Sequence, residues 1–109
     1  LVPHCPECGA PLVPHLRCDD AFVQDVAWYA MRDSYDRWVG DHQSGRVLYL
    51  ELGVGMNTPV WIKYPFWRMA YANPQATYIC CNYGEAYAPK EIASRSILID
   101  ADISHLLGR

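Results

Sequence analysis

The sequence is poor in charged residues, and basic residues are the scarcer kind. Only 19% of its 109 residues are charged, and nine Lys and Arg face twelve Asp and Glu, for a formal net charge of −3. A surface for nucleic acid or anionic membrane needs a basic face, so this balance argues against both partners. Apolar residues make up 51%, which excludes the disorder that comes from low hydrophobicity and high charge.

Long apolar runs and targeting segments are missing as well. No uncharged apolar run approaches the roughly 18–20 residues that a membrane-spanning helix requires. The first residues show no basic segment followed by an apolar stretch, so no secretory signal is visible. We therefore expect a cytoplasmic protein that binds neither nucleic acid nor membrane. The length predicts at most one domain.

The sequence has a single Cys-x-x-Cys pair, which limits what its cysteines can do. Five cysteines, an odd number, do not suggest a disulfide framework. Cys5 and Cys8, followed by glycine (CPECG), form half of a zinc knuckle, in which two thiolates converge on one tetrahedral ion. A closed site needs four ligands, so either Cys18, His4 or His15 completes it or a second pair lies upstream of this sequence. A reduced dithiol without metal is the remaining alternative.

Apolar periodicity predicts helices and strands that alternate along the rest of the chain. The expected elements, in chain order, are a metal-binding loop (1–16), a helix (25 to about 42), a strand (46–52), a glycine turn, a helix (59 to about 72), a strand (76–82), a loop with one helical turn near 91, a strand (96–99) and a helix (100–107). Such alternation predicts an α/β fold with a parallel sheet of about three strands and flanking helices.

The expected sheet has few strands for its type. An all-parallel sheet needs both faces covered and no bare edge, so we expect further strands outside this sequence. The apolar run 46–52 (RVLYLEL) is typical of a strand covered on both faces. Cys80 and Cys81, adjacent in the next strand, should point to opposite faces as small buried hydrophobes.

Proline positions bear on the helix expected from residue 59 to about 72. Asn57 or Thr58 can cap this helix, and Pro59 suits its first position. Pro65 would then lie inside the helix, where we expect it to kink or split the helix.

A glycine turn follows the first expected strand directly. Gly53 and Gly55, in the run GVGMNTP, allow a tight turn and close approach of the backbone to a ligand. A turn between a strand and a helix is a place where backbone amides hold phosphate groups. The run departs from the dinucleotide fingerprint G-x-G-x-x-G, so a strand-to-helix turn without a binding role is the alternative.

Polar residues also follow the other two strands. Asn82 can hydrogen-bond a ribose hydroxyl or act as a plain turn residue, because ligands of open α/β sheets bind at the carboxyl ends of strands. Asp100 either contacts a ligand or caps the final helix, and capping is the commoner role. No Ser/His/Asp or Cys/His arrangement can be assigned from the sequence.

Aromatic residues are abundant for so short a chain. It has four Trp and eight Tyr, several of them in the run 61–71. Aromatic rings bury large areas in a core or an interface, and these are too many for one small core. We expect part of this aromatic surface to pack against protein outside this chain or against a second copy of the chain.

Three runs together resemble a known family: CPECG with LVPHLRCDDAFVQD, then LYLELGVGMNTPVWIKYPFWRM, and then TYICCNYGEAYAPKEIASRSILIDADI. They closely resemble the C-terminal part of bacterial sirtuins, the silent information regulator family, and within it the macrodomain-linked branch, or class M. The resemblance covers nearly the whole chain. It implies a partial Rossmann-like parallel sheet preceded by part of a zinc ribbon.

The resemblance also implies roles for particular residues. Cys5 and Cys8 look like the second zinc-binding pair of sirtuins, and Val13–Asp20 look like the substrate-contacting segment after it. The other matching positions correspond to NAD contacts: the turn after a strand, the Asn that holds the adenosine ribose, and the final turn beside adenine. In this sequence they are Gly53, Gly55, Met56, Asn57, Asn82, Asp100 and Ala101.

The Gly-Ala-Gly-rich NAD loop, the His-Gly catalytic motif and the first zinc pair of sirtuins are absent from this sequence. The resemblance therefore implies a fragment of an NAD-dependent enzyme that transfers ADP-ribose to a protein, a lipoyl-carrier protein in this branch, or deacylates lysine. Residues 1–24 would form the partial zinc module and substrate-side segment, and residues 25–109 the C-terminal part of the NAD-binding domain. The chain alone should bind NAD weakly or not at all, and no catalytic residue is assigned to it. The alternative is a stand-alone zinc-binding interaction module that self-associates through its aromatic surface.

Overall fold

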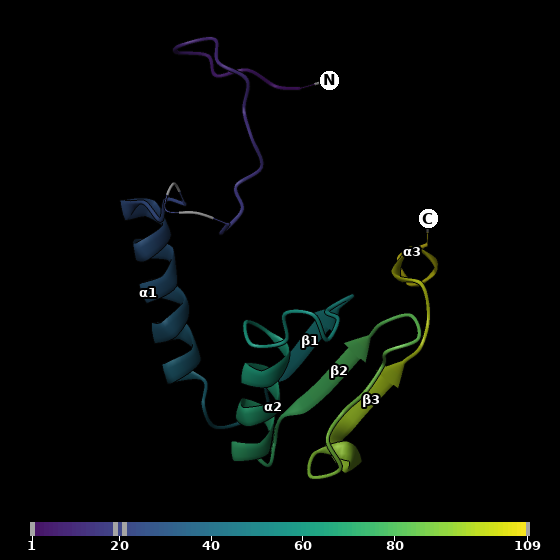
Figure 1. Cartoon of the computed structure of the whole chain (residues 1–109). Coiled ribbons are helices and arrows are strands. Elements are labelled where there is room, and N and C mark those ends of the chain that lie inside the picture. The colour runs from purple at the N-terminus through teal and green to yellow at the C-terminus, as the bar shows by residue number, and fades with distance from the viewer. Residues whose placement is uncertain (1, 19, 21, 109) are drawn as a thin grey trace. The chain divides into compact units, whose positions relative to one another are not determined.

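The computed structural model describes residues 2–18, 20 and 22–108 (Figure 1). The chain divides into two units. The first unit is Leu1–Tyr35 and the second is Asp36–Arg109, so the boundary falls inside the first helix. None of the helices in the described part of the chain is both long enough and apolar enough to cross a bilayer.

The first unit begins with a small hairpin. Backbone hydrogen bonds join Leu12 N to Pro3 O and Cys5 N to Ala10 O, both at 2.8 Å. Gly9 closes the turn with a φ of 72°, a conformation that glycine adopts without steric cost. This hairpin is consistent with the absence of a helical period in the proline-rich start.

Helix α1 (Val26–Asp41) follows, close to its expected bounds. Asp25 caps it as expected, because its Oδ1 accepts a hydrogen bond from Trp28 N at 2.8 Å. None of the described residues of α1 is buried, so burial of apolar side chains contributes little to the stability of this helix.

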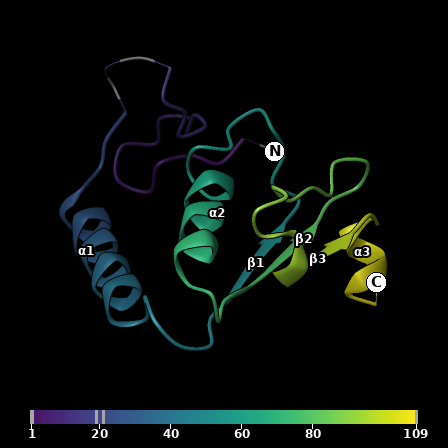
Figure 2. The same cartoon turned by 90° about the horizontal axis from the view of Figure 1, so that it is seen from below.

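The second unit is a small α/β structure built on three parallel strands (Figures 1 and 2). The strands are β1 (Leu48–Leu52), β2 (Thr77–Cys81) and β3 (Ser96–Ile99), in the sheet order β1-β2-β3. Helix α2 (Lys63–Ala72) joins β1 to β2 and packs on one face of the sheet. A short 3₁₀ helix, η1 (Ala93–Arg95), precedes β3, and α3 (Ile103–Leu106) follows it. The predicted α/β class and three parallel strands are confirmed.

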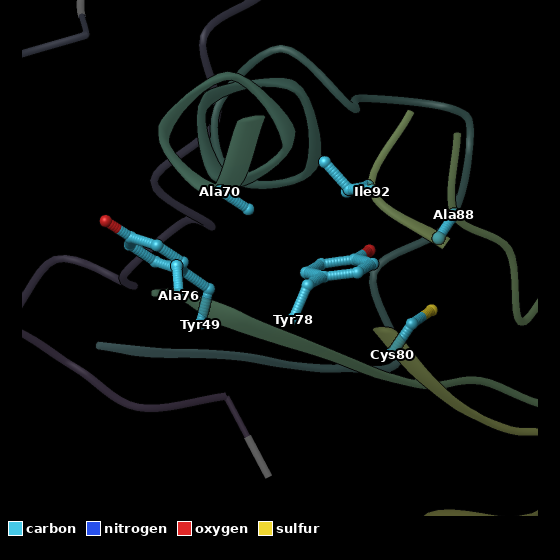
Figure 3. Close-up of a cluster of buried hydrophobic side chains, with 7 residues drawn as sticks. All are labelled: Tyr49, Ala70, Ala76, Tyr78, Cys80, Ala88 and Ile92. Atoms are coloured by element: carbon cyan, nitrogen blue, oxygen red, sulfur yellow. The ribbon is translucent and has the colours of Figure 1, made fainter. Parts of the chain in front are cut away.

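The core of this unit lies between α2 and one face of the sheet. Two tyrosines, Tyr49 of β1 and Tyr78 of β2, point toward Ala70 of α2, and Ile92 closes the cluster on the side of η1 (Figure 3). Cys80 and Cys81 are both buried, at 0% and 4% exposure, as the sequence predicts.

The opposite face of the sheet is apolar and open in the described structure. Leu50 pairs in register with Ile79, and Ile79 with Ile97, so the three share this face. Leu50 and Ile97 are about half exposed, at 47% and 51%. The expectation that 46–52 is covered on both faces is therefore wrong for this chain: β1 alternates between exposed and buried residues.

Helix α2 begins four residues later than the sequence predicts. Residues 59–62 form turns, and the N-cap is Ile62, which makes no side-chain capping bond among the described residues. Pro65 consequently lies in the first turn, where a backbone N–H has no acceptor within the helix. The expectations that Asn57 or Thr58 caps the helix and that Pro65 interrupts it are both wrong.

Arg95 caps the C-terminal end of α2. Its Nη1 donates to Ala70 O and Asn73 O, both at 2.7 Å. Asn73 is buried, and its Nδ2 donates to Gly45 O at 2.9 Å. These bonds satisfy helix-end carbonyls that would otherwise lack partners and connect α2 to the segments before β1 and β3.

We expect Arg95→Met to lower the free energy of unfolding by about 2 kcal/mol, because it removes charged donors from half-buried carbonyls. Urea unfolding followed by circular dichroism measures the change. Arg68→Met is the matched control, because Arg68 is exposed on the same helix, and it should stay within about 0.5 kcal/mol of the unsubstituted chain. Equal effects of the two substitutions would contradict the capping role of Arg95.

Candidate functional site

The candidate site lies where the three strands end. Because β1, β2 and β3 are parallel and adjacent, the residues that follow them meet at one edge of the sheet, where open α/β sheets bind ligands. Gly53, Asn82 and Asp100 each follow one of these strands. The structure therefore brings together candidate residues that are far apart in the sequence.

Gly53 is required by geometry. Its φ is +66°, and a Cβ added there would lie 3.0 Å from Ile103 Cδ1 of α3, so no other residue fits without strain. Its backbone N donates to Cys81 O at 2.8 Å, which continues the β1–β2 pairing by one bond. Gly55 is also closely approached, because a Cβ there would lie 3.2 Å from Glu85 Oε2.

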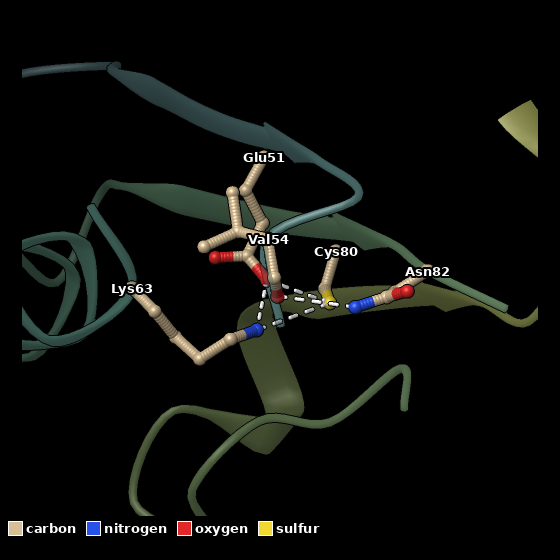
Figure 4. Close-up of polar contacts among 5 residues, drawn as sticks. All are labelled: Glu51, Val54, Lys63, Cys80 and Asn82. Atoms are coloured by element: carbon tan, nitrogen blue, oxygen red, sulfur yellow. Dashed lines mark hydrogen bonds and ion pairs between the residues drawn. The ribbon is translucent and has the colours of Figure 1, made fainter. Parts of the chain in front are cut away.

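Asn82 holds the glycine turn. Its Nδ2 donates to Val54 O at 3.1 Å (Figure 4), and its backbone N donates to Ile99 O at 3.1 Å. The half-buried side chain therefore connects the turn after β1 to the end of β2. This contact is more specific than the plain turn role that the sequence left open.

Asp100 fixes a second loop at the same edge. Its Oδ1 accepts a hydrogen bond from Gly84 N at 2.7 Å, in the segment that follows β2. The expectation that Asp100 caps the final helix is wrong: Asp102 is the N-cap of α3 and accepts from Ser104 N at 2.8 Å. These bonds from Ser104 hold the pKa of Asp102 below its usual value. Ala101 is half-buried between the two aspartates.

The remaining candidates, Met56 and Asn57, are exposed in the loop between β1 and α2. The helix starts only at Lys63, so the glycine turn and the helix N-terminus are ten positions apart in the chain. The sequence predicted a glycine turn that leads directly into a helix. The structure instead places a loop of bends and turns there, which separates the glycine turn from the start of the helix.

A buried polar cluster lies beneath this loop, and sequence reasoning missed it. Lys63 Nζ forms an ion pair with Glu51 Oε1, and Cys80 Sγ donates to the same oxygen at 2.9 Å (Figure 4). All three side chains are at most 1% exposed. Burial, helped by the neighbouring carboxylate of Glu51, raises the pKa of the Cys80 thiol. The one charge in the apolar run RVLYLEL was the signal that could have revealed this cluster.

The Cys5–Cys8 pair is formed by the hairpin of the first unit. Hydrogen bonds from the backbone of Cys8 and Glu7, and then from the Cys8 side chain, lower the pKa of the Cys5 thiol. Within residues 2–18, 20 and 22–108, no three His, Cys, Asp or Glu side chains gather in a way that could hold a metal ion. Neither Cys18 nor His15 therefore completes a site with this pair in the described structure.

Replacing Gly53 by Ala should cost about 2–3 kcal/mol of unfolding free energy, because strain at positive φ adds to the contact with Ile103. Gly84→Ala is the control: its φ of +74° is similar but its surroundings are open, so we expect about 1 kcal/mol. Urea unfolding of both variants measures the difference. The excess should shrink in the double variant Gly53→Ala/Ile103→Ala, and an excess that persists there would contradict the steric explanation.

Comparison with known proteins adds one relative. No protein-family model matches the chain. The chain is similar to a curated protein named "Protein ADP-ribosyltransferase" from Staphylococcus aureus (strain Mu50), with 36% identity over 108 residues. The match covers 98% of this chain but 34% of the relative, so the chain spans about a third of that protein's length.

Proposed function

We propose that this chain forms the adenosine-side half of an NAD site in a sirtuin-like protein ADP-ribosyltransferase. The observation that carries the proposal is the convergence of Gly53, Asn82 and Asp100, with their two bound loops, at the carboxyl edge of a parallel sheet. Similarity to the staphylococcal protein ADP-ribosyltransferase over 98% of the chain supports the same activity class. In this proposal the sheet is part of a Rossmann-like domain (25–109) that follows a partial zinc module (1–24).

The edge residues have distinct roles in this proposal. Backbone N–H groups of the turn from Gly53 to Asn57 donate to phosphate or ribose oxygens, and Met56 lies beside them. Asn82 already donates through Nδ2 to Val54 O, and its Oδ1 accepts a hydrogen bond from a ribose hydroxyl. Asp100 and Ala101 border the adenine ring.

The reaction we propose breaks the bond between nicotinamide and ribose and joins the ribose carbon to a nucleophilic side chain of a protein. Nicotinamide leaves with the bonding electron pair, and the nucleophile loses its proton. The acceptor in this proposal is a lipoyl-carrier protein, and lysine deacylation is the alternative use of the same bond cleavage. We assign no catalytic residue to this chain, so its contribution is to bind and orient the dinucleotide.

A second candidate is a self-associating module, and the open face of the sheet favours it. Apolar residues of β1 and β3 are about half exposed there, and Trp61 in the loop before α2 is 73% exposed. Exposed apolar surface is typical of interfaces. Under this reading two copies bury the surface and share a zinc ion through their Cys5–Cys8 pairs.

The binding role is tested in a chimera in which this chain replaces the matching third of the staphylococcal relative. We expect the chimera to label protein with ADP-ribose from isotopically labelled NAD. Asn82→Ala should reduce the kcat/KM for NAD by about tenfold or more, because it removes a ribose acceptor and loosens the turn. Gln75→Ala is the control: it removes an exposed side-chain amide near the opposite end of β2 and should leave the rate unchanged. A folded Asn82→Ala chimera with unchanged kinetics would contradict the assignment.

Zinc content distinguishes the two candidates further. The hairpin brings the Cys5 and Cys8 thiols together and lowers the pKa of one of them, which suits two of the four ligands of a structural zinc. The first candidate, with half of a zinc site, predicts no stoichiometric zinc on the monomeric chain. The second predicts one zinc per two chains, lost in Cys8→Ser but not in Cys18→Ser. Metal analysis combined with sizing chromatography measures this ratio. One zinc per monomer that requires Cys18 or His15 would instead indicate a self-contained site.

A further inference from the structure

A fully buried ion pair, such as Glu51–Lys63, is not expected in the core of so small a structure. Both residues are 1% exposed, so each charge has lost its hydration. Replacing a buried ion pair by well-packed apolar residues is often neutral or stabilising. The cluster carries a further cost, because Glu51 Oε2, Trp67 Nε1 and Tyr78 OH are buried without a hydrogen-bond partner in the described structure. Stability alone therefore does not account for this pair.

The position of the ion pair indicates a structural role at the loop between β1 and α2. Glu51 lies in β1 two residues before Gly53, and Lys63 is the first residue of α2. The pair thus closes the base of the loop 53–62, which contains the glycine turn and has no strand or helix of its own. Near its start the loop is bound by Asn82 through Val54 O, and the ion pair fixes its far end.

The contacts of the pair are directional. Glu51 Oε1 accepts hydrogen bonds from Lys63 Nζ of α2 and from Cys80 Sγ of β2. Lys63 Nζ also lies 3.8 Å from Cys80 Sγ and 5.7 Å from the centre of the Trp67 ring. Hydrogen bonds to this one oxygen therefore constrain the relative positions of β1, β2 and the start of α2. Apolar packing would constrain these positions less, because it is not directional.

We propose that Glu51 and Lys63 are positioning residues for the glycine turn. Their ion pair joins Glu51, just before the loop 53–62, to Lys63, directly after it, and so holds the backbone of residues 53–57 in the shape that receives the dinucleotide. The effect on the backbone stands by itself, and the effect on NAD affinity rests on the proposed function. The pair touches no ligand and acts only through the loop.

The test compares two double variants of the full chain. Glu51→Leu/Lys63→Met replaces the pair by apolar residues, whereas Glu51→Gln/Lys63→Gln keeps a neutral hydrogen-bonded link. We expect amide hydrogen exchange at residues 53–57 to be about tenfold faster in the Leu–Met variant and close to normal in the Gln–Gln variant, while exchange in β2 stays unchanged. Arg95→Met, which weakens the far end of α2, controls for general destabilisation and should not single out residues 53–57.

The same substitutions in the chimera with the staphylococcal relative give the second readout, the kcat/KM for NAD. We expect the Leu–Met chimera to show a kcat/KM about tenfold lower than the unsubstituted chimera, and the Gln–Gln chimera to recover most of it. Faster exchange in the Leu–Met chain, together with no ADP-ribose labelling by any chimera, would support the positioning role and contradict the proposed function. Unchanged exchange at residues 53–57 in the Leu–Met variant would overturn the positioning role whatever NAD does. Failure of that variant to fold would also overturn it, because the pair would then serve the whole fold.

Discussion

Parallel pairing of three short strands is the constraint on which the second unit depends. It requires every connection to return to the opposite end of the sheet, and it delivers Gly53, Asn82 and Asp100 to one edge. The edge is then ordered by contacts between loops rather than within them: Asn82 binds the turn after β1, and Asp100 binds the segment after β2. Local sequence supplies the residues, and the topology of the sheet brings them to one edge.

The two faces of the sheet differ in the free-energy cost of their buried groups and in how strongly those groups fix the arrangement of the strands and α2. The side under α2 buries an ion pair and two tyrosines, which costs hydration but specifies how the strands and helix are arranged. The other side presents branched aliphatic residues that order nothing in the described structure. A binding role for the edge and an association role for the open face are compatible, because they use different surfaces of the same three strands.

The sequence predicted the features that depend on local periodicity. β3 occupies the expected residues 96–99, and α1 begins at the expected cap Asp25. The start of α2 was mispredicted because Pro59 is as acceptable in a turn as at a helix start. The ion pair of Glu51 with Lys63 was missed because it joins residues 12 positions apart, through a loop whose path no local pattern specifies. Asp100 accepts a hydrogen bond from Gly84 N instead of capping α3. This contact also joins residues far apart in the sequence, so no local pattern could reveal it.

The open face of the sheet also has a thermal consequence. Contact between apolar surfaces is driven by entropy near room temperature and weakens on cooling. Any assembly that buries Leu50 and Ile97, whether with other polypeptide or with a second copy, should release water and lower the heat capacity of the system. Under the second proposal, in which two copies of the chain bury this face, the chain would be most dispersed in the cold and increasingly associated as it is warmed.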